Sequence, residues 1–169
     1  MSSSIIDPYK AAKIGALQSL KIAPKAMSRL SEVVKNLEET TAELRFFWDE
    51  QKRLRVTGQV AAQMDVLCQR CLEPMPLNLE VAVNAAVVWT EEQVTQLSSE
   101  LEPWIGEEER VNAQELLEDE LLLALPIMPA HEQQDCEGLS SFTTEPNEEP
   151  GERQKPFADL ASLIKTTDD

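Results

Sequence analysis

Several residue types are scarce in this chain of 169 residues, and each scarcity excludes a class of protein. Aromatic residues make up 5% of the sequence, which together with ten prolines is typical of a modest core with irregular connections rather than a large enzyme scaffold. There are five glycines and one histidine. Catalysis by a nucleophile and a base therefore has little support, because the sequence has no glycine-rich or oxyanion-hole signature to accompany the single histidine.

Long apolar runs are also missing. The longest, residues 121–128, is far shorter than the roughly 18 residues that cross a bilayer, and it contains Pro126. The first residues lack the basic and apolar regions of a signal peptide. We therefore expect a cytoplasmic protein that does not enter a membrane and whose cysteines stay reduced.

Basic residues are few. The chain has 15 Lys and Arg against 31 Asp and Glu, a formal net charge of −16, which disfavours broad binding to phosphate backbones. Residues 1–36 carry six basic and two acidic side chains, whereas residues 91–169 carry four basic and twenty-one acidic ones. This asymmetry is consistent with a basic partner for the acidic part and a local RNA contact near the start. A purely solubilising role is the alternative.

The N-terminal part has helical signals. Asp7 and Pro8 are typical of a helix start and predict a helix to about Leu20. Apolar residues at helical spacing predict a second helix over about 26–37. We therefore expect N-terminal helices within residues 7–37.

From residue 41 the apolar period changes to two. Alternation continues through residue 90 and predicts an antiparallel β-meander with one buried face, with Gly58 marking a bend or bulge. Residues 112–125 have apolar side chains on one helical face and predict a covering helix. The fold class predicted is α+β, an antiparallel β-meander covered by helices, with acidic flexible connections.

These elements predict one α+β domain over residues 1–136. Residues 137–169 are predicted to be an acidic flexible linker followed by a short amphipathic C-terminal helix. Phe157 and Leu160 lie on its apolar face, which predicts docking either on the protein's own core or on a partner.

A CxxC motif, Cys68 to Cys71, lies between two alternating runs and is predicted to occupy a hairpin end. With His131 and Cys136 the chain has four metal-ligating side chains, the number that a structural zinc site needs. Reduced, partly buried thiols and a surface histidine are the alternative. A thioredoxin-like role is disfavoured because a strand, not a helix, follows the motif. Arg70, between the thiols, is a candidate partner contact or simply a solvent-exposed turn residue.

Acidic residues also gather in the predicted covering helix at Glu115, Glu118, Asp119 and Glu120. Neighbouring carboxylates can bind Mg²⁺ or act as acids and bases, so a metal-dependent RNA-processing enzyme is an alternative function. Acidic residues early in a helix also favour its dipole and commonly face water.

Four segments carry a family resemblance: Ile6-Asp7-Pro8, Leu67-Cys-Gln-Arg-Cys71, Glu118 to Pro129 with His131, and Lys155 to Leu163. In combination they resemble the YceD family of bacterial and plastid proteins, usually named large ribosomal RNA subunit accumulation protein. The resemblance implies a cytoplasmic factor needed for normal accumulation of large-subunit ribosomal RNA.

Many relatives have a further cysteine in a CxGLC arrangement, where this chain has Ser140. A metal site here would therefore need His131, or has been lost. The function predicted is a non-enzymatic ribosome-biogenesis factor that contacts a basic ribosomal protein or large-subunit assembly factor, with rRNA affected indirectly. Direct, specific RNA binding is a further alternative.

Overall fold

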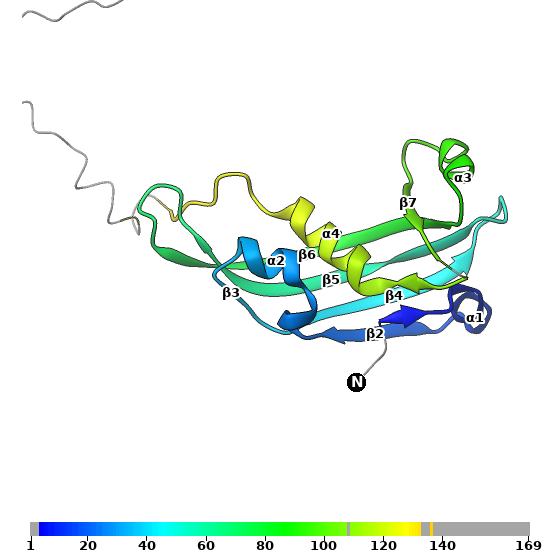
Figure 1. Cartoon of the computed structure of the whole chain (residues 1–169), viewed down its shortest axis with the longest axis horizontal. Helices are drawn as coiled ribbons and strands as arrows, with labels where there is room; N and C mark the ends of the chain where they lie inside the picture. Colours follow the sequence, from blue (N-terminus) through cyan, green and yellow to red (C-terminus); the bar gives the residue numbers. More distant parts are fainter. Residues whose placement is uncertain (1–3, 108, 133–135, 137–169) are drawn as a thin grey trace, which may run out of the picture.

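The computed structural model describes residues 4–107, 109–132 and 136, which form an α+β fold around one large sheet (Figure 1). The strands of this sheet lie in the order β2 (Leu17–Ile22), β4 (Thr40–Trp48), β5 (Leu54–Leu67), β6 (Pro74–Val88) and β7 (Glu102–Ile105). A short strand, β3 (Asn36–Leu37), also pairs with β5. Neighbours are antiparallel except β6 and β7, which are parallel. The predicted α+β class is confirmed.

The helices are α1 (Pro8–Ile14), α2 (Ser28–Val33), α3 (Glu91–Thr95) and α4 (Ala113–Ala124), with a 3₁₀ turn at Pro24–Ala26. A small separate sheet joins β1 (Ile5–Ile6) to β8 (Val111–Asn112). Helices α2 and α4 lie across one face of the large sheet (Figure 1). Between this face and the helices lies the core, whose largest fully buried side chains include Phe46, Met27, Leu30, Leu44, Leu117, Leu121, Val56, Val60 and Val83.

The meander predicted over residues 41–90 is present as β4, β5 and β6. Side chains on alternate positions of β4 and β5 are buried, as the period of two requires. Along β6 the alternate positions are half-buried up to Val81, and the last four residues, Ala85 to Val88, are all buried. Asp49 makes the first turn by accepting the backbone N–H groups of Gln51 and Arg53. The second turn holds the CxxC motif. Because β5 has 14 residues, these two turns lie about 45 Å apart at opposite ends of the sheet.

Gly58 does not mark a bulge. The register of β5 with both neighbours is continuous through this residue, so the predicted bulge is wrong. Glycine is needed because a Cβ at position 58 would collide with the backbone carbonyl oxygen of Glu43 on β4. An extra residue of the kind found in a bulge lies instead between β3 and β4, which pair with the same edge of β5. Between the pairs Leu37 with Met64 and Thr41 with Ala61, three residues face two on β5.

The helices predicted over residues 7–37 are shorter than expected. Helix α1 starts at Pro8 with Asp7 as its cap, as predicted, but Gly15 adopts a left-handed conformation (φ +64°) and ends it. The following residues form β2, whose alternating Leu20 and Ile22 are buried. The prediction of helix to Leu20 is therefore wrong. The second helix is limited to α2, and residues 36–37 pair with β5.

The acidic segment between residues 91 and 110, one of the expected flexible connections, contains regular structure. It forms α3 and then β7, which returns to the sheet beside β6. Trp104 on β7 is buried, with its ring centre 6.2 Å from that of Phe46. Burial of this aromatic side chain explains why an otherwise charged segment is ordered.

The predicted covering helix, residues 112–125, is confirmed as α4. Its cap is Asn112, whose side chain accepts the N–H of Gln114 at 3.3 Å, and the helix ends just before Pro126. Leu117 and Leu121 are fully buried beneath it. α4 contacts β5 and β6. Its C-terminal end points along the sheet toward the CxxC turn (Figure 1).

We expect Gly58→Ala to lower the free energy of unfolding by about 2–3 kcal/mol, because the new methyl group can be accommodated only by separating β4 from β5. Chemical denaturation measures this change. Gln59→Ala, at an exposed position of the same strand, is the control and should change stability by less than about 0.5 kcal/mol. Equal stability of the two variants would contradict the close approach of the strands.

Candidate metal centre

The CxxC motif occupies the turn between β5 and β6, as predicted. The backbone N–H of Cys68 donates to the carbonyl oxygen of Glu73 at 2.9 Å, and the N–H of Leu72 donates to the carbonyl oxygen of Cys68 at 2.9 Å. Leu72 closes the turn in the left-handed region, with φ +63°. This backbone path places the side chains of Cys68 and Cys71 on the same side of the turn.

The chain after α4 runs back to this turn (Figure 1). Two hydrogen bonds attach it there. The N–H of Gln69 donates to the carbonyl oxygen of Pro129 at 2.8 Å, and the guanidinium of Arg70 donates to the carbonyl oxygen of His131. His131 is thereby held beside Cys71, and Cys136 is buried against Cys68.

Four donor atoms converge at this point. Cys68 Sγ lies 3.9 Å from Cys136 Sγ, and Cys71 Sγ lies 3.3 Å from His131 Nδ1. All four donors lie within 4.8 Å of one another. In a tetrahedral zinc site with Zn–S bonds of about 2.3 Å, sulfur ligands are about 3.8 Å apart. The spacing therefore fits a tetrahedral metal ion after small movements, and the group could hold one.

The environment of the sulfurs suits a cation. Burial on its own raises the pKa of Cys68, but the backbone N–H groups of Cys71, His131 and Arg70 outweigh it and lower this pKa to about 5. Burial raises the pKa of Cys136, and the neighbouring sulfurs of Cys71 and Cys68 raise it further. Crowding of thiolates is the condition that a bound divalent cation relieves.

The sequence model of the family described as "Large ribosomal RNA subunit accumulation protein YceD" matches residues 56–164, a range that contains all four donors. This chain belongs to the YceD family. A relative from Haemophilus influenzae, named large ribosomal RNA subunit accumulation protein YceD, is 34% identical over 163 residues, covering 94% of this chain and 93% of the relative. No solved structure shows a significant match. The membership that the four segments predicted is confirmed.

The structure places the other predicted site residues of this YceD-family chain as follows. Arg70 is half-buried and bonded to the carbonyl oxygen of His131, so it is a structural residue of the turn in addition to a candidate contact. Phe157 and Leu160, with the linker and C-terminal helix predicted over 137–169, lie outside the described residues. Within the described ranges, no helix is long and apolar enough to cross a membrane.

The acidic residues of α4 do not converge on one site. Glu118 is 3% exposed and faces α2, where it accepts the N–H of Leu30 at 3.0 Å and pairs with Arg29. Asp119 also pairs with Arg29, at 2.6 Å. Glu120 interacts with Glu102 on β7 instead. Of the described residues, the Cys and His donors rather than these carboxylates form the group whose atoms are close enough for a metal ion.

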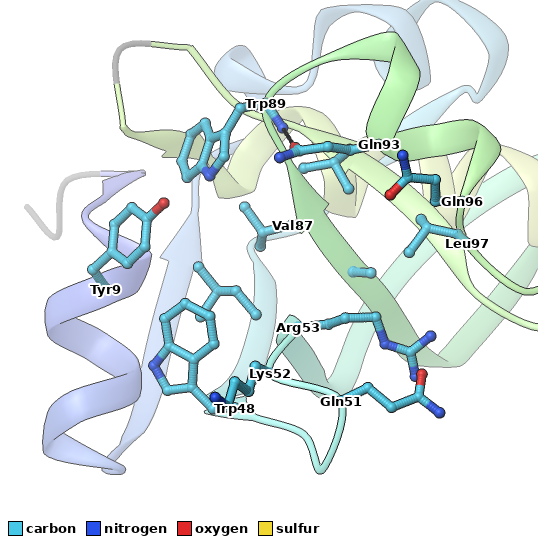
Figure 2. A pocket seen from close by; sticks show the side chains of 13 residues that line it. Tyr9, Trp48, Gln51, Lys52, Arg53, Val87, Trp89, Gln93, Gln96 and Leu97 are labelled. Atoms are coloured by element: carbon cyan, nitrogen blue, oxygen red, sulfur yellow. Dashed lines mark hydrogen bonds between the residues drawn. The ribbon is translucent and has the colours of Figure 1, made fainter.

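A second feature was not predicted from the sequence. Near the turn between β4 and β5, the aromatic rings of Tyr9, Trp48 and Trp89 come together beside an open cavity (Figure 2). Trp48 and Trp89 each continue the apolar alternation of a strand past the end of the core, which is the signal that marks them. Tyr9 joins them from α1, a long-range contact that periodicity does not reveal.

Glu120 provides a pH-dependent test of the packing between α4 and β7. Burial, and then the charges of Glu102 and Asp119, raise its pKa from 4.5 to about 7. The folded protein thus holds this proton more tightly than the unfolded chain does. The stabilisation that comes from the protonated Glu120 side chain is complete below pH 4.5 and is lost as the pH rises through 7.

Glu120→Gln should therefore stabilise the protein at pH 8 and have little effect at pH 4.5 or below. Because the side chain is partly exposed, we expect about 1 kcal/mol, or a rise in Tm of about 2–4 °C. Thermal unfolding at both pH values measures it, with the exposed Glu32→Gln on α2 as control. The same change in Tm at both pH values would contradict the raised pKa of Glu120.

Proposed function

We propose that this protein is a non-enzymatic, cytoplasmic ribosome-biogenesis factor that supports accumulation of large-subunit ribosomal RNA by contacting a basic ribosomal protein or assembly factor. The names of the family and of the Haemophilus influenzae relative support the link to large-subunit RNA. The contact mechanism rests on one observation, an exposed apolar surface held beside the Cys and His group.

We further propose that the four donors hold a structural zinc ion. Three sulfurs and one imidazole nitrogen are typical zinc ligands, and four protein ligands leave no open position for a substrate. A zinc ion here would supply a cross-link between the turn and the segment after α4. The backbone bonds from Gln69 and Arg70 pre-position that segment, so metal binding would lock an arrangement that the chain already favours.

Three large apolar side chains lie exposed around this junction, and we define them as the apolar tip. Leu72 is 67% exposed, Ile127 is 98% exposed and Met128 is 74% exposed. Apolar side chains gathered on a rigid, rather than frayed, part of a surface are typical of protein contact sites. The turn and the clamped segment together provide that rigidity.

Leu72 supports this interpretation independently. It adopts the left-handed conformation, which costs a residue with a Cβ about 1–2 kcal/mol and which glycine adopts freely. A strained leucine that exposes its side chain contributes little to folding. The strain is explained if the side chain is used in binding.

Charge indicates what kind of partner fits. Glu73 and Glu132, both exposed, flank the apolar tip, and residues 91–169 carry twenty-one acidic side chains against four basic ones. An apolar surface with an acidic surround complements a basic polypeptide and repels phosphate. Ribosomal RNA would then be protected indirectly, through the protein that is bound.

The alternative of a metal-dependent RNA-processing enzyme is less favoured. Both carboxylate oxygens of Glu118 accept hydrogen bonds, one from Leu30 and one from Arg29, and Asp119 is paired with the same arginine. A catalytic Mg²⁺ would have to displace these bonds. They join α2 to α4, which is a sufficient structural role for the pair.

The zinc proposal predicts about one zinc ion per chain in freshly purified protein. Cys71→Ser and His131→Ala should each lose most of it, whereas Gln69→Ala, an exposed non-ligand in the same turn, should retain it. Chelation should lower Tm by about 10 °C, because a ligand at about 1,000 times its Kd stabilises by about 4 kcal/mol. Elemental analysis of the wild type that finds no metal would end this proposal.

The contact proposal predicts that a substitution at Leu72 changes the stability and the function of the protein in opposite directions. Leu72→Gly should raise the free energy of unfolding by about 0.5–1 kcal/mol, since strain is relieved, yet fail to restore large-subunit rRNA in cells depleted of the protein. Ile127→Asp should also fail. Ile14→Ser, an exposed apolar position on α1, should restore rRNA as the wild type does.

The measurements are denaturation of the purified variants and quantification of precursor and mature rRNA, with the proteins that co-purify. Normal rRNA in depleted cells would refute the proposed function itself. Full complementation by both apolar-tip variants would instead refute the contact surface.

A further inference from the structure

An open cavity of about 410 Å³ lies at the end of the sheet opposite the Cys and His group. It is formed where the β4–β5 turn, the end of β6 and helix α3 meet. Figure 2 shows aromatic rings on one side of it and polar side chains on the other. Its volume is in the range of sites for small ligands or parts of larger ones.

The aromatic side is built from three elements. The ring of Tyr9 stacks on that of Trp89, with centres 5.7 Å apart and planes 16° apart, and its centre lies 5.9 Å from that of Trp48. Gly106 fixes Trp89, because a Cβ there would enter the indole ring. Trp89 is thus stacked with Tyr9, has Gly106 against its ring and is mostly buried, so the tryptophan more available for stacking with a ligand is Trp48, which is 48% exposed.

The side chains that line the cavity carry a charge opposite in sign to the net charge of the protein. Of the residues that the structure describes, those lining it include Lys52 and Arg53 and no carboxylate, although the chain carries 31 acidic residues. Arg53 is paired with Asp49 at 2.7 Å. Lys52 makes no ion pair within the described part of the chain, and it is held at the rim by the left-handed turn (φ +59°). An anionic ligand is favoured here.

The polar side can recognise an aromatic ligand by its edge. Gln93 and Gln96 line the cavity opposite the rings (Figure 2). The side-chain oxygen Oε1 of Gln93 already accepts the backbone N–H of Trp89 at 2.7 Å, so the side-chain nitrogen Nε2 is left to donate to a ligand. Primary amides both donate and accept, as nucleobase edges require.

We propose that this cavity binds single-stranded RNA, with one base stacked on Trp48 and the adjoining phosphate beside Lys52. Aromatic platforms combined with nearby cations are the usual means of holding single-stranded nucleic acid. A free nucleotide is a poorer fit, because the lining has no glycine-rich loop or cluster of cations to bind several phosphates. The contact is local, which is compatible with a net charge of −16.

This proposal goes beyond the proposed protein contact and does not depend on it. The apolar tip and the aromatic cavity lie at opposite ends of β5, about 45 Å apart. A ribosomal protein at one end and an RNA strand at the other could therefore be bound together.

Titration of the purified full chain with a short, mixed-sequence single-stranded RNA at low salt tests the proposal. Tryptophan fluorescence should be quenched as a base stacks, and the anisotropy of labelled RNA should report binding. Trp48→Ala should weaken binding about 10-fold, whereas Trp48→Phe should retain most of it. Lys52→Ala should weaken it about 3-fold and make the salt slope shallower by about 0.7, with Lys35→Ala as the exposed control.

Thermal unfolding establishes that each variant is folded. Equal RNA binding by the wild type and Trp48→Ala, or no binding by the wild type at low salt, would overturn the proposal. So would quenching by AMP at lower concentration than by RNA, or quenching by a proline-rich peptide and not by RNA. None of these outcomes affects the rRNA measurements that test the proposed function.

Discussion

The attachment of the chain after α4 to the β5–β6 turn is the constraint on which the candidate metal centre depends. Gln69 and Pro129 share the central backbone hydrogen bond of this attachment. Because of it, donors that are 60 and 68 residues apart in the sequence lie within 4.8 Å of one another, close enough for the group to hold one ion. Helix α4 is held at its other end too, where the N–H of Ala113 donates to the carbonyl oxygen of Ser4. The helix therefore cannot slide on the sheet without breaking one of these attachments.

Much of this arrangement follows from the sequence because it is local. Alternating apolar residues predicted β4, β5 and β6, and the CxxC motif between two such runs was correctly placed at a turn. What failed was the N-terminal part. There a single left-handed glycine, Gly15, ends α1, and pairing with β4 decides the conformation of the next six residues. Pairing of that kind is a tertiary interaction, and intrinsic propensity does not reveal it.

The scarcity of cysteine and histidine made the Cys and His group predictable from the sequence, whereas the aromatic cavity was not predicted. With three cysteines and one histidine in the chain, the set of soft ligands could be chosen in only one way. The aromatic cavity had no such advantage. Trp48 shares its strand face with Leu44 and Phe46, which are fully buried, and only the length of the strand shows that position 48 passes beyond the core.

The long sequence separation within the Cys and His group has a consequence for synthesis. Cys68 and Cys71 leave the ribosome about sixty residues before His131 does. A nascent chain can thus offer a metal ion two thiolates early, but a closed tetrahedron only after α4 has been made and has packed. Complete coordination would mark the moment at which both halves of the fold have been translated and joined.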